Sequence, residues 1–321
     1  MTDYTYAVAR IRSREGTLLS NADLETLINQ KDVVSCIRFL SEKGFGDNAE
    51  NTKPEKLLKA EDEKTWQFVR ELLPDLTTLD FFLMPNDFHN LKVAIKCITR
   101  NRKADDFLLD GGTVDAQFIY SCVEKRDYDS LPQHLSDVAQ TAMKTLLQTS
   151  DGQLCDFIID KACLESVYKC KEKNENEIIK LYCELFVASA DIKIAVRCAK
   201  TGKSLDFILK YLVPCDSLNV EKLAKAAAKS VEDISEYLLE TDYKTAVDAL
   251  QSSMSAFEKW CDDYLTNAMK PQKWEPFSIG PIVAFVIARN NEIKAVRMIL
   301  TAKTANIDTD VVRERLREMY V

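Results

Sequence analysis

One pattern of hydrophobic and polar positions occurs three times in the sequence. Residues 90–97 read NLKVAIKC, residues 191–198 read DIKIAVRC, and a looser copy at 292–299 reads EIKAVRMI. Each copy begins 101 residues after the previous one (191 − 90 and 292 − 191). Self-similarity at a fixed period is typical of chains built from repeated structural units. The pattern therefore predicts a body made from one helical unit used three times, with each stretch on an inner helix of its unit.

Other hydrophobic positions predict further helices. Apolar residues three or four apart along 220–238 are typical of an amphipathic helix, and 282–302 is apolar on nearly every face, which indicates a central helix. Glycine and proline number only eight each, so helix breakers are scarce. We predict helices at 4–19 and 20–40, a polar loop after Gly46, a short helix from Pro54, helices at 61–84 (kinked or divided at Pro74) and 85–100, starts at 113, 157, 216 and 257, and helices at 282–302 and 311–320.

The two ends of the sequence predict how the repeats are joined. Residues 306–320 read as the start of a fourth unit, and residues 4–19 read as the end of a unit without its beginning. Helices from neighbouring repeats would then complete one another's bundles. We expect one continuous all-α body with interlocked repeat units at 1–112, 113–216 and 217–321.

Composition narrows the classes of partner. The 321 residues carry a formal net charge of −8. An acidic chain repels phosphate groups, which disfavours nucleic acid as the main partner and anionic lipid as a docking surface. The longest apolar run, 282–288, is far shorter than the ~20 residues of a membrane-spanning helix. The start of the chain lacks a basic region followed by an apolar stretch, so we expect a cytosolic protein.

The ten cysteines do not indicate a metal or redox centre. None forms a C-x-x-C pair, and Cys155, Cys163 and Cys170 are seven or eight residues apart, which is typical of a helix core. We interpret them as buried, reduced thiols. Neither of the two histidines has a metal-ligand companion at useful spacing, so we expect no structural zinc and no other cofactor.

No motif in the sequence argues for an enzyme. The stretch 201–204 reads TGKS, like the end of a phosphate-binding loop, but Arg197 stands where that motif needs glycine, and a helix precedes it instead of a strand. We interpret it as a helix C-terminus capped by Gly202. The acidic pairs at 105–106, 262–263 and 308–310 are interpreted as solvated faces or helix starts, because acid–base catalysis needs two acids in a shared cleft.

Basic residues gather after each repeat helix, and acidic residues begin the next helix. One explanation is that cations at helix C-termini and anions at N-termini complement the helix dipoles. Another is that a near-threefold body collects the basic turns on one rim and presents them to a partner. The predicted partner-binding residues are Arg100, Arg102, Lys103, Lys200, Lys203 and Lys303, with Arg12 and Arg14 in an equivalent turn; the acidic residues are Asp23, Asp110, Asp115, Asp216, Asp308 and Asp310.

Three stretches carry a resemblance to a known family: YxYAxARIR at 4–12 followed by Leu18 and Leu19, DFHNLK at 87–92, and RxRLRxxYV at 313–321. With the threefold repeat, they resemble the C subunit of bacterial and archaeal V-type ATPases, whose eukaryotic counterpart is the d subunit. The similarity runs over the whole chain, in order and with matching length.

The resemblance implies an all-α funnel of three similar helical bundles about a pseudo-threefold axis. It implies a non-catalytic rotor subunit on the cytoplasmic face of the membrane, which couples the central stalk to the proteolipid ring during ATP-linked proton or sodium transport. It also implies no nucleotide, metal or small-molecule substrate. We interpret Asn90 and Lys92 as residues that hold helices together, and the third copy departs from their pattern.

Two other interpretations stay open at this point. A helical-repeat scaffold would bind peptides in a concave groove, but such repeats usually span 33 to 47 residues. A helical enzyme with a cryptic acidic site is the other alternative. Copurification with a proteolipid ring and a stalk would separate these possibilities.

Overall fold

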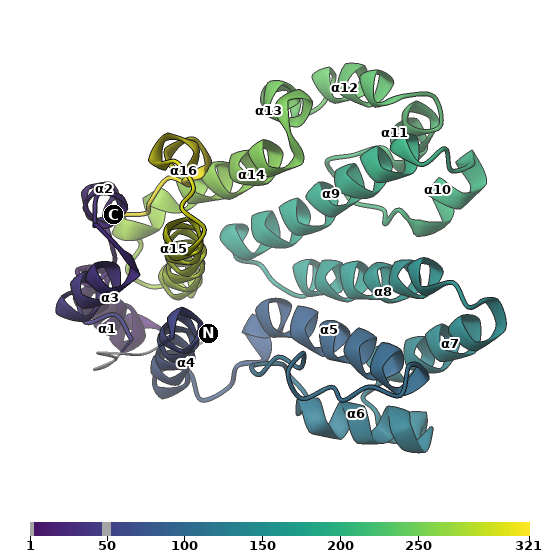
Figure 1. Cartoon of the computed structure of the whole chain (residues 1–321), viewed down its shortest axis with the longest axis horizontal. Coiled ribbons are helices and arrows are strands. Elements are labelled where there is room, and N and C mark those ends of the chain that lie inside the picture. The colour runs from purple at the N-terminus through teal and green to yellow at the C-terminus, as the bar shows by residue number, and fades with distance from the viewer. Residues whose placement is uncertain (1–2, 47–52) are drawn as a thin grey trace. The chain divides into compact units, whose positions relative to one another are not determined.

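The computed structural model describes residues 3–46 and 53–321 (Figure 1). Over these ranges the chain forms α-helices and short 3-10 helices, without a β-strand. The all-α prediction is therefore confirmed. The polar loop predicted after Gly46 lies outside the described residues. None of the described helices is long and apolar enough to cross a bilayer.

The chain divides into two compact units. Unit 1 comprises Met1–Leu76, Asn176–Leu181 and Asp248–Val321, and unit 2 comprises Thr77–Glu175 and Tyr182–Val247. Each unit has its own cluster of buried hydrophobic side chains. The predicted division into three repeat units, and their arrangement as a funnel, remain predictions.

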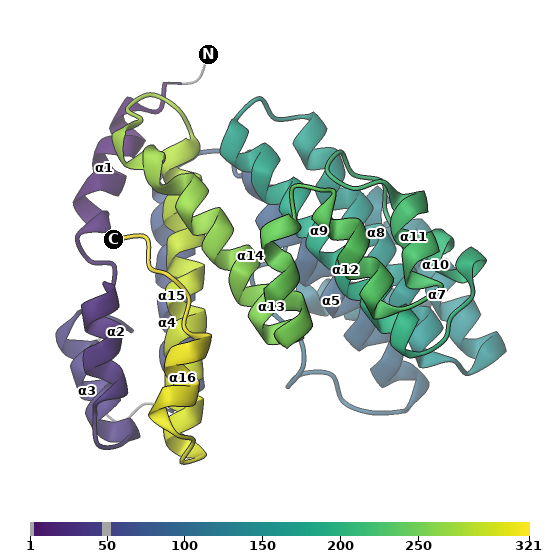
Figure 2. The same cartoon turned by 90° about the horizontal axis from the view of Figure 1, so that it is seen from above.

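The central helix of unit 1 is α15 (Gly280–Thr304), as the apolar stretch 282–302 predicts. It is buried on most of its faces. Figure 2 shows α1, followed by α2 and α3, along the length of α15. The surrounding elements are α1 (Thr5–Glu15), α2 (Asn21–Ile28), α3 (Val33–Glu42), α4 (Pro54–Leu72), α14 (Met254–Met269), η4 (Lys270–Trp274) and α16 (Thr309–Arg315); α13 (Val247–Ser252) precedes α14.

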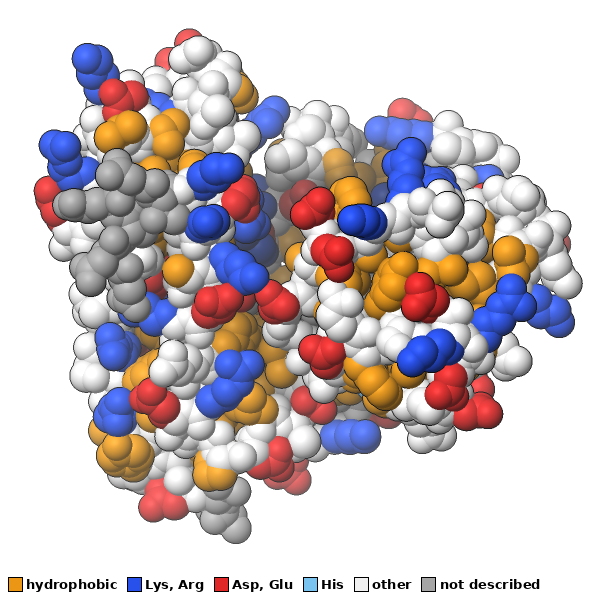
Figure 3. Space-filling view, turned by 60° about the horizontal axis from the view of Figure 1, so that its bottom comes forward, with side chains coloured by type: hydrophobic (Ala, Val, Ile, Leu, Met, Phe, Trp, Pro, Cys, Tyr) orange, Lys and Arg blue, Asp and Glu red, His pale blue; other side chains and the backbone are white. Residues whose placement is uncertain are grey.

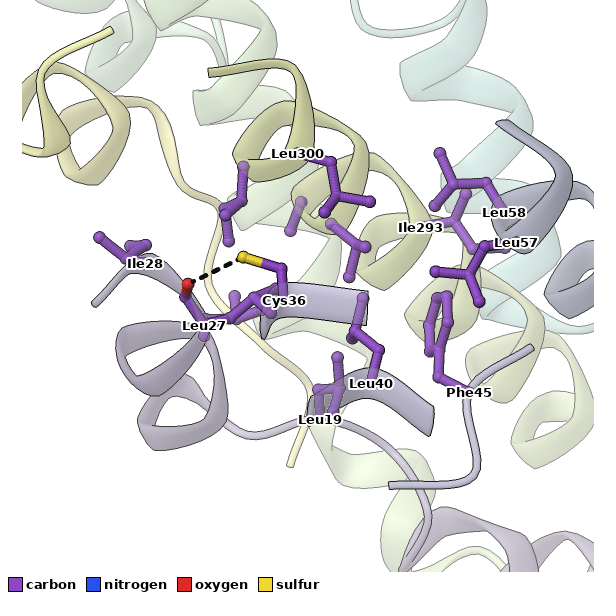
Figure 4. Close-up of a cluster of buried hydrophobic side chains, with 14 of the residues drawn as sticks. Leu19, Leu27, Ile28, Cys36, Leu40, Phe45, Leu57, Leu58, Ile293 and Leu300 are labelled. Atoms are coloured by element: carbon purple, nitrogen blue, oxygen red, sulfur yellow. Dashed lines mark hydrogen bonds between the residues drawn. The ribbon is translucent and has the colours of Figure 1, made fainter. Parts of the chain in front are cut away.

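The core of unit 1 joins the start of the chain to its last long helix (Figure 4). Leu19, Leu40 and Phe45 belong to the same cluster of buried side chains as Ile293 and Leu300 of α15. Each fully buried leucine or isoleucine contributes about 1.5–3 kcal/mol relative to an exposed one. Burial of these apolar side chains therefore fixes α2 and α3 beside α15.

Three long helices form the frame of unit 2. α5 (Asp80–Thr99) and α9 (Glu177–Lys200) run in the same direction, and α8 (Gly152–Glu172) lies between them and runs the opposite way (Figure 1). The shorter elements are η1 (Thr77–Leu79), α6 (Ala116–Lys125), η2 (Tyr128–Ser130), α7 (Gln133–Thr149), α10 (Leu205–Tyr211), α11 (Val220–Ala227), α12 (Val231–Leu239) and η3 (Lys244–Ala246).

Several predicted helix boundaries are wrong because a capping side chain starts a new helix inside an apolar pattern. The single helix predicted at 20–40 is α2 and α3, since the Asp32 side chain accepts the Ser35 N–H. The helix predicted through 220–238 is α11 and α12, since the Ser230 side chain accepts the Asp233 N–H. These side chains satisfy donors that a helix start leaves free. The other shifted boundaries are those of α1, α6, α8, α14 and α16.

Two prolines act differently from one another. Pro74 divides the region 61–84, because α4 ends at Leu72, just before the residue that proline excludes from helical geometry. α4 also begins at Pro54, so it is one helix where a short and a long one were predicted. Pro85, predicted as a helix start, lies inside α5. It lacks only one backbone donor, and the buried Phe81 and Leu83 extend the helix N-terminal to it.

Candidate functional site

The three recurring stretches lie on α5, α9 and α15. Each stretch begins with a polar residue in an otherwise apolar surrounding: Asn90, Asp191 and Glu292. Their exposed fractions are 0%, 0% and 1%. A buried polar group is costly unless it is hydrogen-bonded, so the partners of these three residues reveal what the recurring stretch does.

All three residues bind the main chain of a distant turn. The Asn90 amide accepts the Leu109 N–H and donates to the Leu109 carbonyl, both at 2.8 Å. The Asp191 carboxyl accepts the Val213 N–H with both oxygens at 3.2 Å. The Glu292 carboxyl accepts the Leu19 N–H.

We call Asn90, Asp191 and Glu292 the turn anchors. The turns that they hold precede α6, α11 and α2, each of which begins the next run of short helices. The third anchor reaches residue 19, near the start of the chain. The third repeat helix therefore takes its turn from the N-terminal segment.

Lysines in the same stretches join neighbouring helices. Lys92 of α5 donates to Asp160 of α8, and Lys294 of α15 lies 3.0 Å from Asp262 of α14. These side chains are partly exposed, so each pair contributes about 1 kcal/mol or less. The interpretation that Lys92 holds helices together is confirmed, whereas Asn90 holds the Leu109 turn instead of another helix.

The anchors differ in their chemistry although they share a position in the repeat. Burial raises the pKa of Asp191 to about 8 and that of Glu292 to about 7. Arg289 lies beside Glu292 and lowers its pKa in part, whereas Asp191 forms no ion pair among the residues that the structure describes. Asn90 does not titrate in this range.

The three repeat helices end in the same way. Asn101, Gly202 and Asn306 adopt positive φ angles of 51°, 63° and 50°. The next residue in each case donates its N–H to a carbonyl five residues back: Arg102 to Cys97, Lys203 to Cys198, and Ile307 to Ala302. This pattern is the Schellman motif, in which a left-handed residue closes a helix. The interpretation of 201–204 as a helix end is therefore confirmed.

The predicted partner-binding residues occupy these helix ends. Arg100 is the C-cap of α5, Lys200 is the last residue of α9, and Lys303 lies in the last turn of α15. The Lys203 ammonium lies 5.0 Å from the centre of the Phe207 ring. Within residues 3–46 and 53–321, none of the six (Arg100, Arg102, Lys103, Lys200, Lys203, Lys303) forms an ion pair.

The structure brings some of these residues together. α5 and α9 run in the same direction, so the turns 100–103 and 200–203 lie at the same end of unit 2 (Figure 1). Lys303 belongs to unit 1. Acidic and basic side chains are interspersed on the face in Figure 3, so that face shows no large region of one sign.

The acidic residues at the following helix starts have mixed roles. Asp115 and Asp308 are N-caps of α6 and α16, and Asp23 completes a capping box with Ser20. These three agree with dipole complementation. Asp216 does not begin a helix; it pairs with Lys171 at 2.6 Å.

The remaining chemical candidates have structural contacts. Asp262 pairs with Lys294 and Arg317, and Asp263 accepts the Glu318 N–H. His134 lies 3.6 Å from Asp87. In the part of the chain that the structure describes, no three His, Cys, Asp or Glu side chains are placed to hold a metal ion.

One feature of unit 1 was missed by sequence reasoning. A cavity of about 440 Å³ lies among α1, α4, α15 and the turn after α3, with Arg14, Glu61, Lys64, Phe68 and Arg289 among its lining residues. Glu61 and Arg289 are also part of a buried charged group. The only signal of this group in the sequence was polar residues within predicted helices, and that pattern does not show which of these residues contact one another in the fold.

Comparison with known protein families shows to which family this chain belongs. The family model described as ATP synthase (C/AC39) subunit matches residues 7–315. The chain belongs to this family. The match covers both units and all three copies of the recurring stretch, so the resemblance on 4–12, 87–92 and 313–321 is confirmed at the level of the family.

Three relatives are similar over nearly the whole chain. The C subunit of the V-type sodium ATPase of Enterococcus hirae is 22% identical over 97% of this chain and 97% of its own length. The C subunit of the A-type ATP synthase of Methanocaldococcus jannaschii is 23% identical, covering 98% and 86%. The C subunit of the V-type ATP synthase of Thermus thermophilus is 23% identical, covering 94% of each.

Proposed function

We propose that this chain is a non-catalytic rotor subunit of a V-type ATPase or ATP synthase. It acts as a socket between the central stalk and the membrane proteolipid ring, and it couples them during ATP-linked proton or sodium transport. The observation that carries the proposal is the C/AC39 family match over residues 7–315. The three relatives named above are matched over at least 86% of their own length.

The architecture suits a coupling element. Torque must pass through surfaces that resist slip, which favours long helices, tightly held turns and broad interfaces. The turn anchors and the Lys92–Asp160 and Lys294–Asp262 pairs hold such helices together. We infer that three similar bundles surround a pseudo-threefold axis and form a funnel on the cytoplasmic face of the membrane. The protein would need no nucleotide, metal or other cofactor.

The basic helix ends are the proposed contact residues. Their side chains are exposed or half-buried and form no ion pair among the described residues. A surface cation without an ion-pair partner attracts a carboxylate on an approaching protein and so steers association. Arg100, Arg102 and Lys103 form the densest of these groups, at one end of unit 2.

Copurification tests the function. The chain is expressed with the stalk proteins and the proteolipid of one rotary ATPase and is isolated through an affinity tag. We expect the ring and the stalk to be recovered with it in fixed proportion. A monomer that retains neither of them would refute the proposal.

Charge reversal tests the contact residues. We expect Arg100→Glu, Arg102→Glu and Lys103→Glu together to abolish assembly without unfolding the chain. The matched control reverses three other exposed lysines of unit 2, Lys125, Lys144 and Lys169, and should assemble normally. Unchanged assembly of the first variant would assign these residues to helix-dipole complementation alone.

A further inference from the structure

A group of three buried charged residues lies inside unit 1, and two of them, Glu61 and Arg289, line the 440 Å³ cavity. Glu61 of α4, Arg289 of α15 and Glu292 of α15 have exposed fractions of 1%, 5% and 1%. Arg289 Nη1 lies 3.1 Å from Glu61 Oε1 and 2.5 Å from Glu292 Oε2. Two buried carboxylates therefore share one guanidinium.

The same three side chains hold the segments that flank α2 and α3. Glu292 accepts the Leu19 N–H, and Arg289 Nη2 donates to Thr17 Oγ1 at 3.1 Å. Glu61 accepts the Gly46 N–H at 2.8 Å. The charged group thus fastens the chain just before α2 and just after α3.

The other charged groups near the cavity have contacts of their own. Lys64 lies 3.6 Å from Glu61 and donates to the Gly44 carbonyl. Charged side chains on the remaining elements around α15 have partners of their own. These pairs are Arg14 with Phe68, Lys43 with Asp23, Glu71 with Arg10, Asp262 with Lys294 and Arg317, Arg313 with Glu25 and Asp310, and Lys270 with Glu318.

Ionising a second carboxylate within this buried group costs free energy. Burial disfavours the ionised form, and the neighbouring charge of Glu61 adds to the effect, so the pKa of Glu292 rises from 4.5 to about 7 despite Arg289. The repeat itself supplies a comparison. At the equivalent position of α5, the uncharged Asn90 holds the Leu109 turn, so holding a turn does not require a charge.

We propose that Glu292 is a proton-binding site that controls how tightly residues 17–19, and with them α2 and α3, dock on α15. When Glu292 is protonated, Arg289 no longer divides its charge between two carboxylates, and the Glu292 carboxyl still accepts the Leu19 N–H. When Glu292 is ionised, the docked turn encloses a second desolvated carboxylate that shares the Arg289 guanidinium with Glu61. Undocking brings water to that carboxylate, and the cavity is lined by its hydrogen-bond partners Leu19 and Arg289.

The direction in which pH changes docking follows from the linkage between proton binding by Glu292 and docking. The pKa of Glu292 is higher in the docked state than in an undocked, hydrated one, so proton uptake favours docking. With values of about 7 and 4.5, the ratio of docked to undocked chain rises roughly tenfold from pH 8 to pH 6. Docking strengthens as the pH falls and weakens as it rises through 7.

Hydrogen exchange of the full chain tests this site. Exchange is followed by mass spectrometry at pH 6, 7 and 8 and corrected for the intrinsic pH dependence of amide exchange. For peptides covering 19–28, we expect the opening equilibrium to rise roughly tenfold from pH 6 to pH 8. Peptides covering 109–119, held by Asn90, serve as the internal reference and should not change.

Two variants decide the assignment. Glu292→Gln, a neutral isostere of the protonated acid, should hold 19–28 at all three pH values as tightly as the parent does at pH 6. Glu61→Gln leaves Glu292 paired with Arg289 alone and should move the transition to lower pH. A parent without pH dependence, a Glu292→Gln variant that keeps it, or a Glu292→Gln variant that fails to fold would each overturn the proposal.

Discussion

At the scale of single residues, the turn anchors show that one position can do the same mechanical task with different chemistry. Asn90, Asp191 and Glu292 each bind a main-chain N–H from a buried site. An amide does so without a charge, whereas a carboxyl must either keep a proton or meet a counterion. The pH response of the molecule therefore depends on which of these side chains stands at the first position of each copy.

Asp191→Asn is expected to remove one source of pH dependence. The folded chain keeps a proton on Asp191 up to about pH 8, and the unfolded chain loses it near pH 4. The free energy of unfolding therefore falls as the pH rises through this window. The asparagine variant should be at least as stable as the parent at pH 8, and its advantage should shrink toward pH 5 in urea titrations. A variant that is less stable at both pH values would contradict this assignment.

At the scale of the elements, helix ends account for most of the regularity of the repeat. α5, α9 and α15 all end in a left-handed residue followed by a hydrogen bond five residues back. This geometry places Arg102 and Lys203 at the same step of their turns. A Cβ at Gly202 would meet no atom within 4 Å, so only its positive φ of 63° disfavours a side chain there.

Gly202→Ala should cost about 1 kcal/mol, because a side chain disfavours the left-handed backbone even where space is open. Denaturant unfolding measures the change. The matched control is Gly152→Ala at the start of α8, which is equally open but lacks a positive φ, and which should be neutral or slightly stabilising. Equal effects at the two sites would rule out backbone strain as the cause.

Element boundaries could be predicted only in part. The helix through 282–302 follows from its continuous apolar run, and the end of α4 follows from Pro74. The break between α2 and α3 does not, because Asp32 could lie on a solvent-facing turn of one long helix. Whether such a residue caps a new helix depends on which side chains the core must bury on either side of it.

At the scale of the whole molecule, burial determines the state of the cysteines. Eight of the ten are buried, and Cys170 and Cys215 are half-buried; all ten are free thiols. Burial raises the pKa of Cys36 and Cys155 to about 11. The burial predicted for Cys155 and Cys163 is confirmed, whereas the predicted burial of Cys170 is wrong, since this side chain is half-buried.

The thiols should therefore react slowly in the folded chain. At pH 7.5 we expect a thiol-specific alkylating agent to modify Cys170 and Cys215 first, because these two are only half-buried. Burial raises the pKa of these two thiols as it does that of Cys36 and Cys155, so access decides the order. All ten should react within the same time after unfolding in urea. Mass spectrometry of the labelled chain counts the modified sites. Rapid labelling of Cys36 or Cys155 in the folded chain would contradict the buried core.

The sequence by itself determined the all-α class and the three recurring stretches, because helix propensity and periodicity are local properties of the chain. Similarity to known sequences over residues 7–315 showed the membership of the C/AC39 family. The partner-binding role of the basic helix ends follows from neither source alone and awaits the assembly test. Tertiary structure alone decided the meeting of Glu292 with Leu19, 273 residues apart, and of Glu61 with Arg289. Burial, and with it the cost of a charge, is set by whatever the fold brings near a side chain.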